Sequence, residues 1–280
     1  MPVRTGFIAL ALSALIVLFA FAGGGEAAES KKGKYEGMLL IPAGPFTMGR
    51  SGGPPDEVPG HLVRLPAFYI DKNLVTWADY AKFIDKKGPE GPKREVYLDF
   101  YDEDTRIMEI AGKGWIVQKG FEKFPAGEMA WAGAVAYCKW RGKRLPSEAE
   151  WEKAARGTDA RLYPWGNQKP TRDLAFFGGF RNDAAPVGIH PKGASPYGAL
   201  DMAGQVWEWT RSLYRPYPYV PGDGRENLKA PGPRVARGGN TSDDAEGLTS
   251  TSRVPVYPGR LEGGHRYFGF RCASKQQLLM

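Results

Sequence analysis

The sequence predicts a loop-rich domain of the mixed α/β (α+β) class with little regular secondary structure. Gly (37) and Pro (23) together make up more than a fifth of the 280 residues, which favours turns and short elements over long helices. Short apolar runs of strand length alternate with only a few stretches of helical periodicity. No internal repeat is visible, and we expect one domain over residues 37–275, a size that one core can support.

The first part of this domain is predicted to be built of short strands. Residues 37–41 (GMLLI) are typical of a buried strand, and residues 42–44 (PAG) are typical of a turn. Residues 45–49 (PFTMG) are then expected to return as the second strand of a hairpin. Two more short strands are expected at 62–65 and 68–71.

Capping residues and apolar periodicity predict the helices. Thr76 caps the first, whose apolar residues over 77–84 recur at i, i+3, i+4 and i+7. The second has its apolar face within residues 131–138. The third begins with a capping box at residues 147–150 (SEAE) and ends at Gly157, where a left-handed conformation is expected.

The remaining chain has fewer periodic elements. Residues 93–124 look like an insert without a recognisable motif, and residues 206–210 (VWEWT) alternate as a strand does. Strands are also expected at 234–237 and 267–273, and they enclose about thirty residues rich in Gly, Ser, Thr and Asp. Since a long loop in a compact domain is usually functional, we expect this loop to be the working surface.

The N-terminus indicates export. Residues 7–22 form an apolar run of sixteen residues behind a single Arg, and small residues follow it, so residues 1–28 are predicted to be a signal peptide. The protein would then be periplasmic or secreted, with no membrane span after cleavage. An uncleaved N-terminal anchor is the alternative, although a spanning helix needs about 20 residues. Residues 29–36 are predicted to be a linker and residues 276–280 a tail.

Charge and cysteine content narrow the function further. The net charge of +7 is spread along the chain, which favours solvated faces over nucleic-acid binding. There are two cysteines, Cys138 and Cys272. They pair with each other in an oxidising compartment or stay buried as free thiols, and the sequence does not decide between these alternatives.

Several ordered segments resemble the formylglycine-generating enzyme family, also called the sulfatase-modifying factor domain. They are GMLLIPAGPFTMGR, WAGAVAYCKWRGKRLPSEAEWEKAARG, YPWG, GALDMAGQVWEWT, RVARGGN and FGFRCA. The resemblance implies a C-type-lectin-like α/β fold with an unusually large share of loop. It covers the chain almost from end to end after the N-terminal segment.

The founding activity of that family is the oxidation of a client sulfatase cysteine to formylglycine, by copper held on two cysteine thiolates after the RGG strand. The matching loop here, residues 240–248, contains no cysteine, and Cu(I) prefers thiolate sulfur over carboxylate oxygen. Bound copper and this oxidase activity are therefore not expected. A second branch uses iron and carries an extra His-rich domain, which the scattered His61, His190 and His265 do not provide.

Calcium is the cofactor that the resemblance does imply. One structural calcium site of the family, carried over residue by residue, takes the side chains of Asp201 and Glu208 and the backbone carbonyls of Gly204 and Val206. Ca²⁺ prefers several hard oxygen ligands from one turn, and this segment offers them. The alternative is that Glu208 simply pairs with an arginine.

The resemblance also points to a binding groove. Trp207 matches a groove-lining aromatic residue of the enzyme, and polar residues follow it in the long loop. Alternatively, Arg237, Arg253 and Arg271 pair with Asp243, Asp244 and Glu246 only to hold the loop. The candidate groove residues are Trp207, Arg237, Asn240, Asp243, Asp244 and Arg253.

An intact scaffold without the oxidant ligands suggests a binding or accessory protein that assists the maturation of another exported protein. Its partner would be a protein or peptide. A metal-dependent enzyme built on Asp243, Asp244 and Arg253 is one alternative. A carbohydrate- or envelope-binding module, suggested by the fold and by 8 Trp and 13 Tyr, is another.

Overall fold

The computed structural model describes Met1 and residues 35–102, 104–179, 184–259 and 267–276. All elements described below belong to the unit Gly37–Met280, which is distinct from Met1–Glu36. The predicted signal peptide, the linker and the tail lie almost entirely outside the described residues. Within those residues, no helix combines the length and the apolar character that crossing a bilayer requires.

A three-stranded antiparallel sheet joins the two ends of the domain. Its strands are β1 (Met38–Ile41), β4 (Phe68–Asp71) and β11 (Ala273–Lys275), with β4 in the middle. A separate antiparallel pair is formed by β2 (Gly44–Met48) and β3 (His61–Leu65). All of the strands predicted before the first helix are therefore present.

The predicted hairpin between the first two strands is wrong, because β1 and β2 lie in different sheets. The turn between them faces a helix. Lys153 Nζ donates hydrogen bonds to the carbonyl oxygens of Pro42 (2.6 Å) and Gly44 (3.0 Å). These bonds hold the turn against the lysine, and the two strands leave it toward different partners.

The four-stranded sheet is built from strands of the C-terminal half. Its order is β10 (Phe268–Gly269), β7 (Trp207–Leu213), β8 (Arg234–Arg237) and β9 (Arg253–Val256), with β10 parallel to β7 and the other pairs antiparallel. The strand predicted at 267–273 is divided, because β10 joins this sheet and β11 joins the three-stranded one. The C-terminal segment therefore links the two sheets.

The predicted helices are confirmed as α2 (Trp77–Lys87), α3 (Trp131–Trp140) and α4 (Glu148–Arg156), and a short 3-10 helix, η1, covers Pro191–Gly193. The capping box of α4 is complete: Glu150 N donates to Ser147 Oγ (3.1 Å) and Ser147 N donates to Glu150 Oε2 (2.8 Å). At α2 the Thr76 hydroxyl accepts from Asp79 N and donates to the Asp79 carboxylate.

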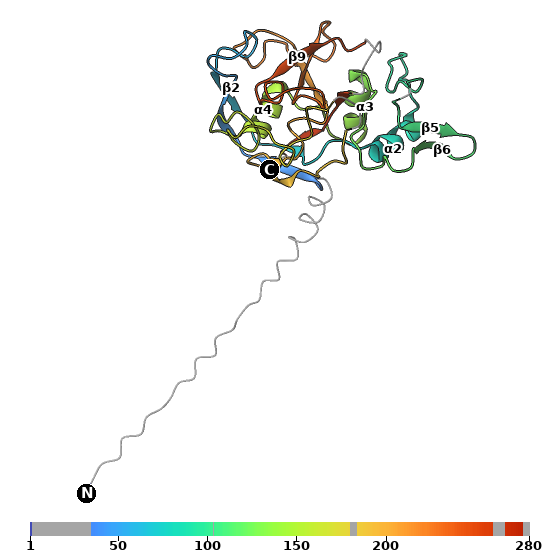
Figure 1. Cartoon of the computed structure of the whole chain (residues 1–280), viewed down its shortest axis with the longest axis horizontal. Coiled ribbons are helices and arrows are strands. Elements are labelled where there is room, and N and C mark those ends of the chain that lie inside the picture. The colour runs from blue at the N-terminus through green and yellow to red at the C-terminus, as the bar shows by residue number, and fades with distance from the viewer. Residues whose placement is uncertain (2–34, 103, 180–183, 260–266, 277–280) are drawn as a thin grey trace. The chain divides into compact units, whose positions relative to one another are not determined.

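The insert contains a hairpin that the sequence analysis missed. Strands β5 (Ile107–Ile110) and β6 (Gly114–Val117) pair with each other and pack beside α2, at the edge of the folded unit in Figure 1. The available signal was two short apolar runs separated by three residues that include a glycine. Gly112, in that turn, has φ of +74°, a conformation that favours glycine.

The largest apolar cluster lies between α2, α3 and the four-stranded sheet, around Trp209 and Phe270. Within it, Cys138 of α3 and Cys272 form a disulfide with a Cα–Cα distance of 5.6 Å. Of the two alternatives left by the sequence, the pairing is therefore the one present. It ties α3 to the segment before β11, 134 residues away.

Replacing both cysteines by alanine should lower the free energy of unfolding by about 2–5 kcal/mol, because the cross-link restricts the unfolded chain. Urea denaturation of the purified protein measures this difference. Adding reductant to the natural protein should produce a similar loss, and adding it to the double variant should produce none. Equal stability of the oxidised protein and the variant would contradict the expectation.

Candidate functional site

Helix α4 positions the surroundings of the candidate site although it carries five charged residues. All nine of its residues are buried, and Glu148 and Glu152 are completely inaccessible to solvent. A buried carboxylate without a partner is strongly unfavourable. Each of these two glutamates is therefore expected to have a cationic partner, and each has one from the four-stranded sheet.

Arg253, at the start of β9, is the partner of Glu148. Its Nε lies 2.7 Å from Glu148 Oε1 and its Nη2 lies 3.0 Å from Glu148 Oε2, the bidentate geometry that suits a guanidinium. The guanidinium also lies over the rings of Tyr214 (4.4 Å) and Tyr217 (4.3 Å). With no exposed side-chain surface, Arg253 has no face left for a ligand.

Arg237, at the end of β8, pairs with Glu152 through its Nη2 atom. Its Nη1 donates to the carbonyl oxygens of Thr251 (2.5 Å) and Ser252 (2.8 Å), and its side chain is also completely buried. Glu152 in turn accepts from Arg156 Nη1 (3.0 Å). The structure thus places Arg237 and Arg253 in the core rather than along a groove.

The alternative interpretation, that the arginines hold the structure together, therefore describes Arg237 and Arg253. The partners predicted for them were wrong, however. Instead of the acidic residues of the loop, the arginines pair with carboxylates of α4 and β7, because those carboxylates are buried and need compensation. The observed pairs are Arg237 with Glu152, Arg253 with Glu148 and Arg271 with Glu208.

The loop after β8 folds tightly back on itself. Gly238 and Gly239 have φ of +100° and +74°, and a Cβ on Gly239 would lie 2.8 Å from the carbonyl oxygen of Gly247. Asn240 N donates to Asp243 Oδ2 and Ser242 N donates to Asn240 Oδ1, both at 2.7 Å. The loop is therefore held in one shape by its own side chains.

Three of the predicted groove residues do come together at this loop. The Asp243 carboxylate accepts a hydrogen bond from Asn240 N and lies beside the Trp207 side chain. Burial raises the pKa of Asp243 above its ordinary value, and these two neighbours only partly offset that effect. The neighbouring Asp244 is exposed and accepts from Glu246 N (3.0 Å) and Gly247 N (3.2 Å).

A second set of contacts attaches the loop to the rest of the domain. Glu246 pairs with Arg50, which also pairs with Glu57 (2.8 Å). Gly179 N donates to the carbonyl oxygen of Thr241 (2.9 Å). The surface made by Trp207, Asn240, Asp243 and Asp244, called the loop surface below, is therefore fixed at both ends. Residues 260–266 of the long loop lie outside the described residues.

The two side chains predicted to bind calcium, those of Glu208 and Asp201, have other partners. Glu208 forms a bidentate ion pair with Arg271, with distances of 2.7 Å to Nε and 2.8 Å to Nη2. Asp201 Oδ2 accepts from Gly188 N (2.6 Å). Burial raises the pKa of both carboxyl groups. A cation at this place would have to share Glu208 with a guanidinium, so the arrangement gives no support for calcium, which stays a prediction.

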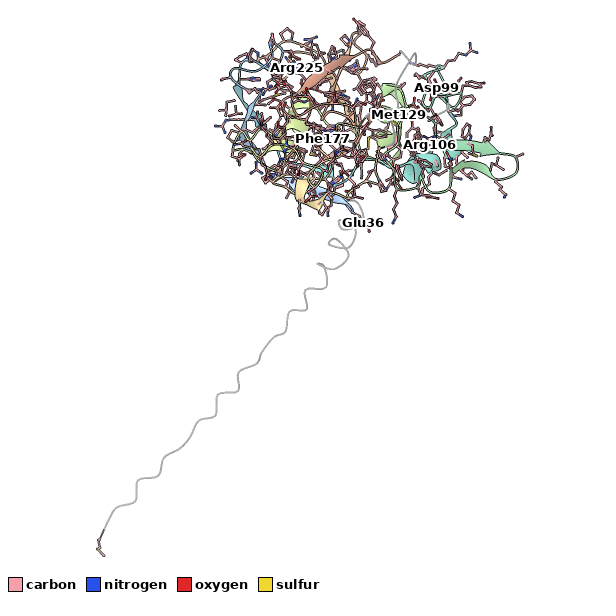
Figure 2. All side chains as sticks on the ribbon, viewed as in Figure 1. Glu36, Asp99, Arg106, Met129, Phe177 and Arg225 are labelled. Carbon is pink, nitrogen blue, oxygen red and sulfur yellow. A yellow bond between two sulfur atoms is a disulfide. The ribbon has the colours of Figure 1, made fainter. Side chains whose placement is uncertain are left out.

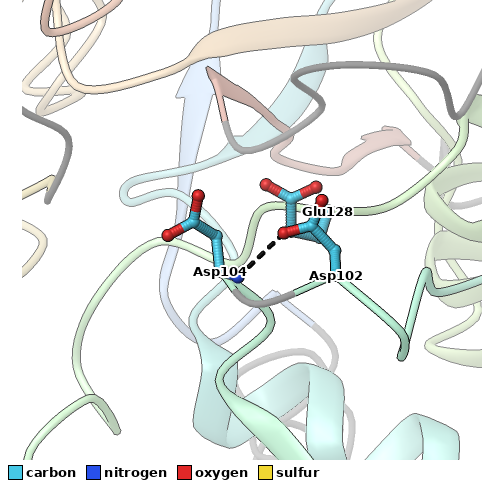
Figure 3. Close-up of side chains that lie close together, drawn as sticks. All are labelled: Asp102, Asp104 and Glu128. Carbon is cyan, nitrogen blue, oxygen red and sulfur yellow. Dashed lines mark hydrogen bonds between the residues drawn. The ribbon is translucent and has the colours of Figure 1, made fainter.

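An acidic cluster that was not predicted from the sequence joins the insert to Glu128, which follows it in the chain. One carboxylate oxygen from each of Asp102, Asp104 and Glu128 lies within 4.8 Å of the others, and Asp104 N donates to Asp102 Oδ1 (Figure 3). Arg106 Nη2 lies 3.5 Å from Asp104. Asp99 and Arg106 of the same insert are labelled in Figure 2. Acidic groups of this kind are common without an ion, so the cluster by itself defines no site.

Comparison with known proteins identifies the family. The chain belongs to the family of sulfatase-modifying factor enzyme 1-like domains, whose model matches residues 24–276. It is 34% identical over 274 residues to the inactive C-alpha-formylglycine-generating enzyme 2 of Mus musculus, and the match covers 85% of each chain. The predicted fold and the stated resemblance are both confirmed.

Other relatives are longer than this chain. It is 34% identical over 248 residues to serine/threonine-protein kinase pkn1 of Chlamydia caviae, with 85% of this chain and 38% of that protein covered. It is 37% identical over 208 residues to hercynine oxygenase of Mycolicibacterium smegmatis, with 64% and 46% covered. The chain thus spans less than half the length of these two relatives.

A solved structure shares the fold. The structure of PvdO from Pseudomonas aeruginosa superimposes with a TM-score of 0.66 at 26% sequence identity. The match covers 85% of this chain and 94% of that one. The loop-rich α/β arrangement described above is therefore shared along almost the whole of that chain.

Changing Arg253 to methionine should destabilise the protein by about 3–5 kcal/mol, because Glu148 would stay buried without its cation. Changing the exposed Asp244 to asparagine should alter the free energy of unfolding by no more than about 0.5 kcal/mol. Chemical denaturation measures both. If the arginine substitution changes the free energy of unfolding only slightly, Arg253 would again be a candidate binding residue.

The raised pKa of Asp243 predicts a definite pH dependence. The folded protein keeps this proton to a higher pH than the unfolded chain, whose aspartates titrate near pH 3.9. The contribution of Asp243 to stability should therefore fall as the pH rises from about 4 toward the folded-state pKa. Denaturation at several pH values should show the natural protein losing stability relative to the Asp243→Asn variant across this window. A relative gain would contradict the assignment.

Proposed function

We propose that this chain is an exported member of the family without formylglycine-generating oxidase activity, and that it binds a protein or peptide partner through the loop surface. The main observation behind the proposal is that both cysteine sulfur atoms are bonded in a disulfide. The only two cysteines of the sequence form a disulfide in the core, so the chain offers no thiolate to a soft metal. Asp243 and Asp244 supply hard oxygen atoms in the loop instead.

The relatives support a non-oxidase member. The mouse protein that matches over 85% of its length is itself named as inactive. The scaffold is intact, but its loop lacks the cysteine thiolates that hold copper in the oxidase. An accessory role, such as helping another exported protein to mature, fits this combination. The retained ion pairs of α4 preserve that scaffold, since none of them depends on a bound metal.

Export is supported by two features of the chain. The apolar run at residues 7–22 has the composition of a signal peptide. The Cys138–Cys272 disulfide requires an oxidising compartment to persist, and the periplasm and the extracellular space are such compartments. Together these features favour a periplasmic or secreted protein.

The geometry of the loop surface suits binding. Its shape is held by the hydrogen bonds of Asn240 and Asp243 and by the Arg50–Glu246 pair, so little conformational entropy is lost when a partner docks. Asp244 supplies an exposed carboxylate, whereas Trp207 is buried and offers little surface to a partner. A partner segment with donor groups would complement this surface.

A metal-dependent enzyme is the second candidate, and the similarity to hercynine oxygenase favours it. Of the residues proposed for such a site, Arg253 is engaged with Glu148, which leaves Asp243 and Asp244. Metal analysis after dialysis separates the candidates. A transition metal that is retained by the natural protein and lost from the Asp243→Ala variant would favour the enzyme.

The oxidase activity can be tested directly. The purified protein is incubated with copper, oxygen and a cysteine-containing sulfatase-motif peptide, and the peptide is analysed by mass spectrometry. We expect no aldehyde product, and no more oxygen consumption than free copper causes by oxidising the thiol to a disulfide without the protein, because copper has no thiolate ligands here. Conversion of the cysteine to the aldehyde would refute the first part of the proposal.

Binding through the loop surface needs a separate test. A photo-crosslinking residue at the exposed Ser242 should give a discrete product with a protein of the cell envelope, whereas the same residue at the exposed Lys113 of the insert should not. The product should disappear when Asp244 is also changed to alanine. Equal crosslinking from both positions would contradict specific docking on the loop surface.

A further inference from the structure

A cavity of about 190 Å³ lies between α3, the bend that follows it and the C-terminal part of β7. Val135, Leu145 and Leu228 supply its apolar lining, and Leu228 is 42% exposed although it is a large apolar residue. The surface inside the cavity is almost entirely apolar. It is separate from the loop surface and is not used by the proposed function.

The charged residues that line this cavity are all cationic. They are Lys139, Lys143, Arg144 and Arg211, and no carboxylate lines it. Because the inside is apolar, their aliphatic stems line the cavity while their charged ends lie outside it, as is common for long cationic side chains. An apolar recess whose charged lining residues are all cationic differs from an ordinary gap in the packing.

Three of these cations are already compensated by carboxylates outside the cavity. The pairs are Lys143 with Asp71 (2.6 Å), Arg144 with Glu150 (2.6 Å) and Arg211 with Glu226 (3.1 Å).

One cation of the lining, at the end of α3, is not compensated. Lys139 is exposed and makes no ion pair within the described residues. The lining therefore carries one uncompensated positive charge, that of Lys139.

The size of the cavity indicates what it accepts. Sites for small molecules usually have volumes of about 300–1,000 Å³, so this one is small for a cofactor or a free metabolite. It is better suited to one apolar side chain that anchors a larger partner, as buried anchors do in protein interfaces.

We propose that this cavity is a docking site for an acidic peptide segment of a partner protein, in which one leucine-sized side chain enters the recess. A carboxylate beside that side chain would face Lys139. The apolar lining supplies affinity through burial, and the uncompensated charge of Lys139 selects acidic sequences and orients the segment.

The test uses three synthetic peptides, acetyl-EELEE-amide, acetyl-EEAEE-amide and acetyl-QQLQQ-amide, titrated into the isotope-labelled full chain. Backbone amide shifts of residues around the cavity report binding. We expect saturable shifts with EELEE, and affinities at least about tenfold weaker for the other two, a difference of about 1.4 kcal/mol. Equal binding of EEAEE or QQLQQ, or no saturation with EELEE, would overturn the proposal.

Two variants and a matched control complete the experiment. Lys139→Gln should weaken EELEE binding several-fold, and Leu228→Asp should abolish it by placing a carboxylate at the mouth. Both residues are exposed, so both variants should keep the natural unfolding midpoint. Lys87→Gln removes an exposed lysine from α2 and should change nothing. If Lys87→Gln loses as much affinity for EELEE as Lys139→Gln does, the loss comes only from the change in net charge. That result would refute the site.

Discussion

The buried ion pairs of α4 are the interaction on which the rest of the structure depends. Glu148 and Glu152 reach Arg253 and Arg237 on neighbouring strands of the four-stranded sheet, and Lys153 holds the turn between β1 and β2. One short helix in the middle of the unit (Figure 1) therefore connects three sheets. Because each buried charge is stable only while its partner is present, these contacts specify one arrangement of the sheets.

The sequence predicted the parts of the fold that are encoded locally. The capping box at Ser147, the periodicity of α2 and most strands depend on neighbouring residues, and they were found. The hairpin of β1 with β2 was predicted wrongly because Lys153, more than a hundred residues away, decides where the turn faces. The pairing of Arg237 with Glu152 was missed for the same reason, since a linear pattern carries no information on which carboxylates become buried.

The site was predicted only in part. Asn240 and Asp243 come together because the loop after the RGG segment folds back on itself, and Trp207 reaches them from β7, which pairs with β8. Arg237 and Arg253 come from the strands on either side of this loop, but their side chains are buried in the core. A scaffold that buries its arginines against α4 leaves the loop free to change its chemistry, which fits a family that includes proteins named both as oxygenases and as inactive.

The three-stranded sheet has a consequence for how the domain combines with others. Strands β1 and β11 lie on either side of β4, and neighbouring strands are about 4.8 Å apart, so the first and last strands of the domain are about 10 Å from each other. A unit whose ends lie this close together can be inserted into another polypeptide, because the host residues on either side of the insertion can stay near each other.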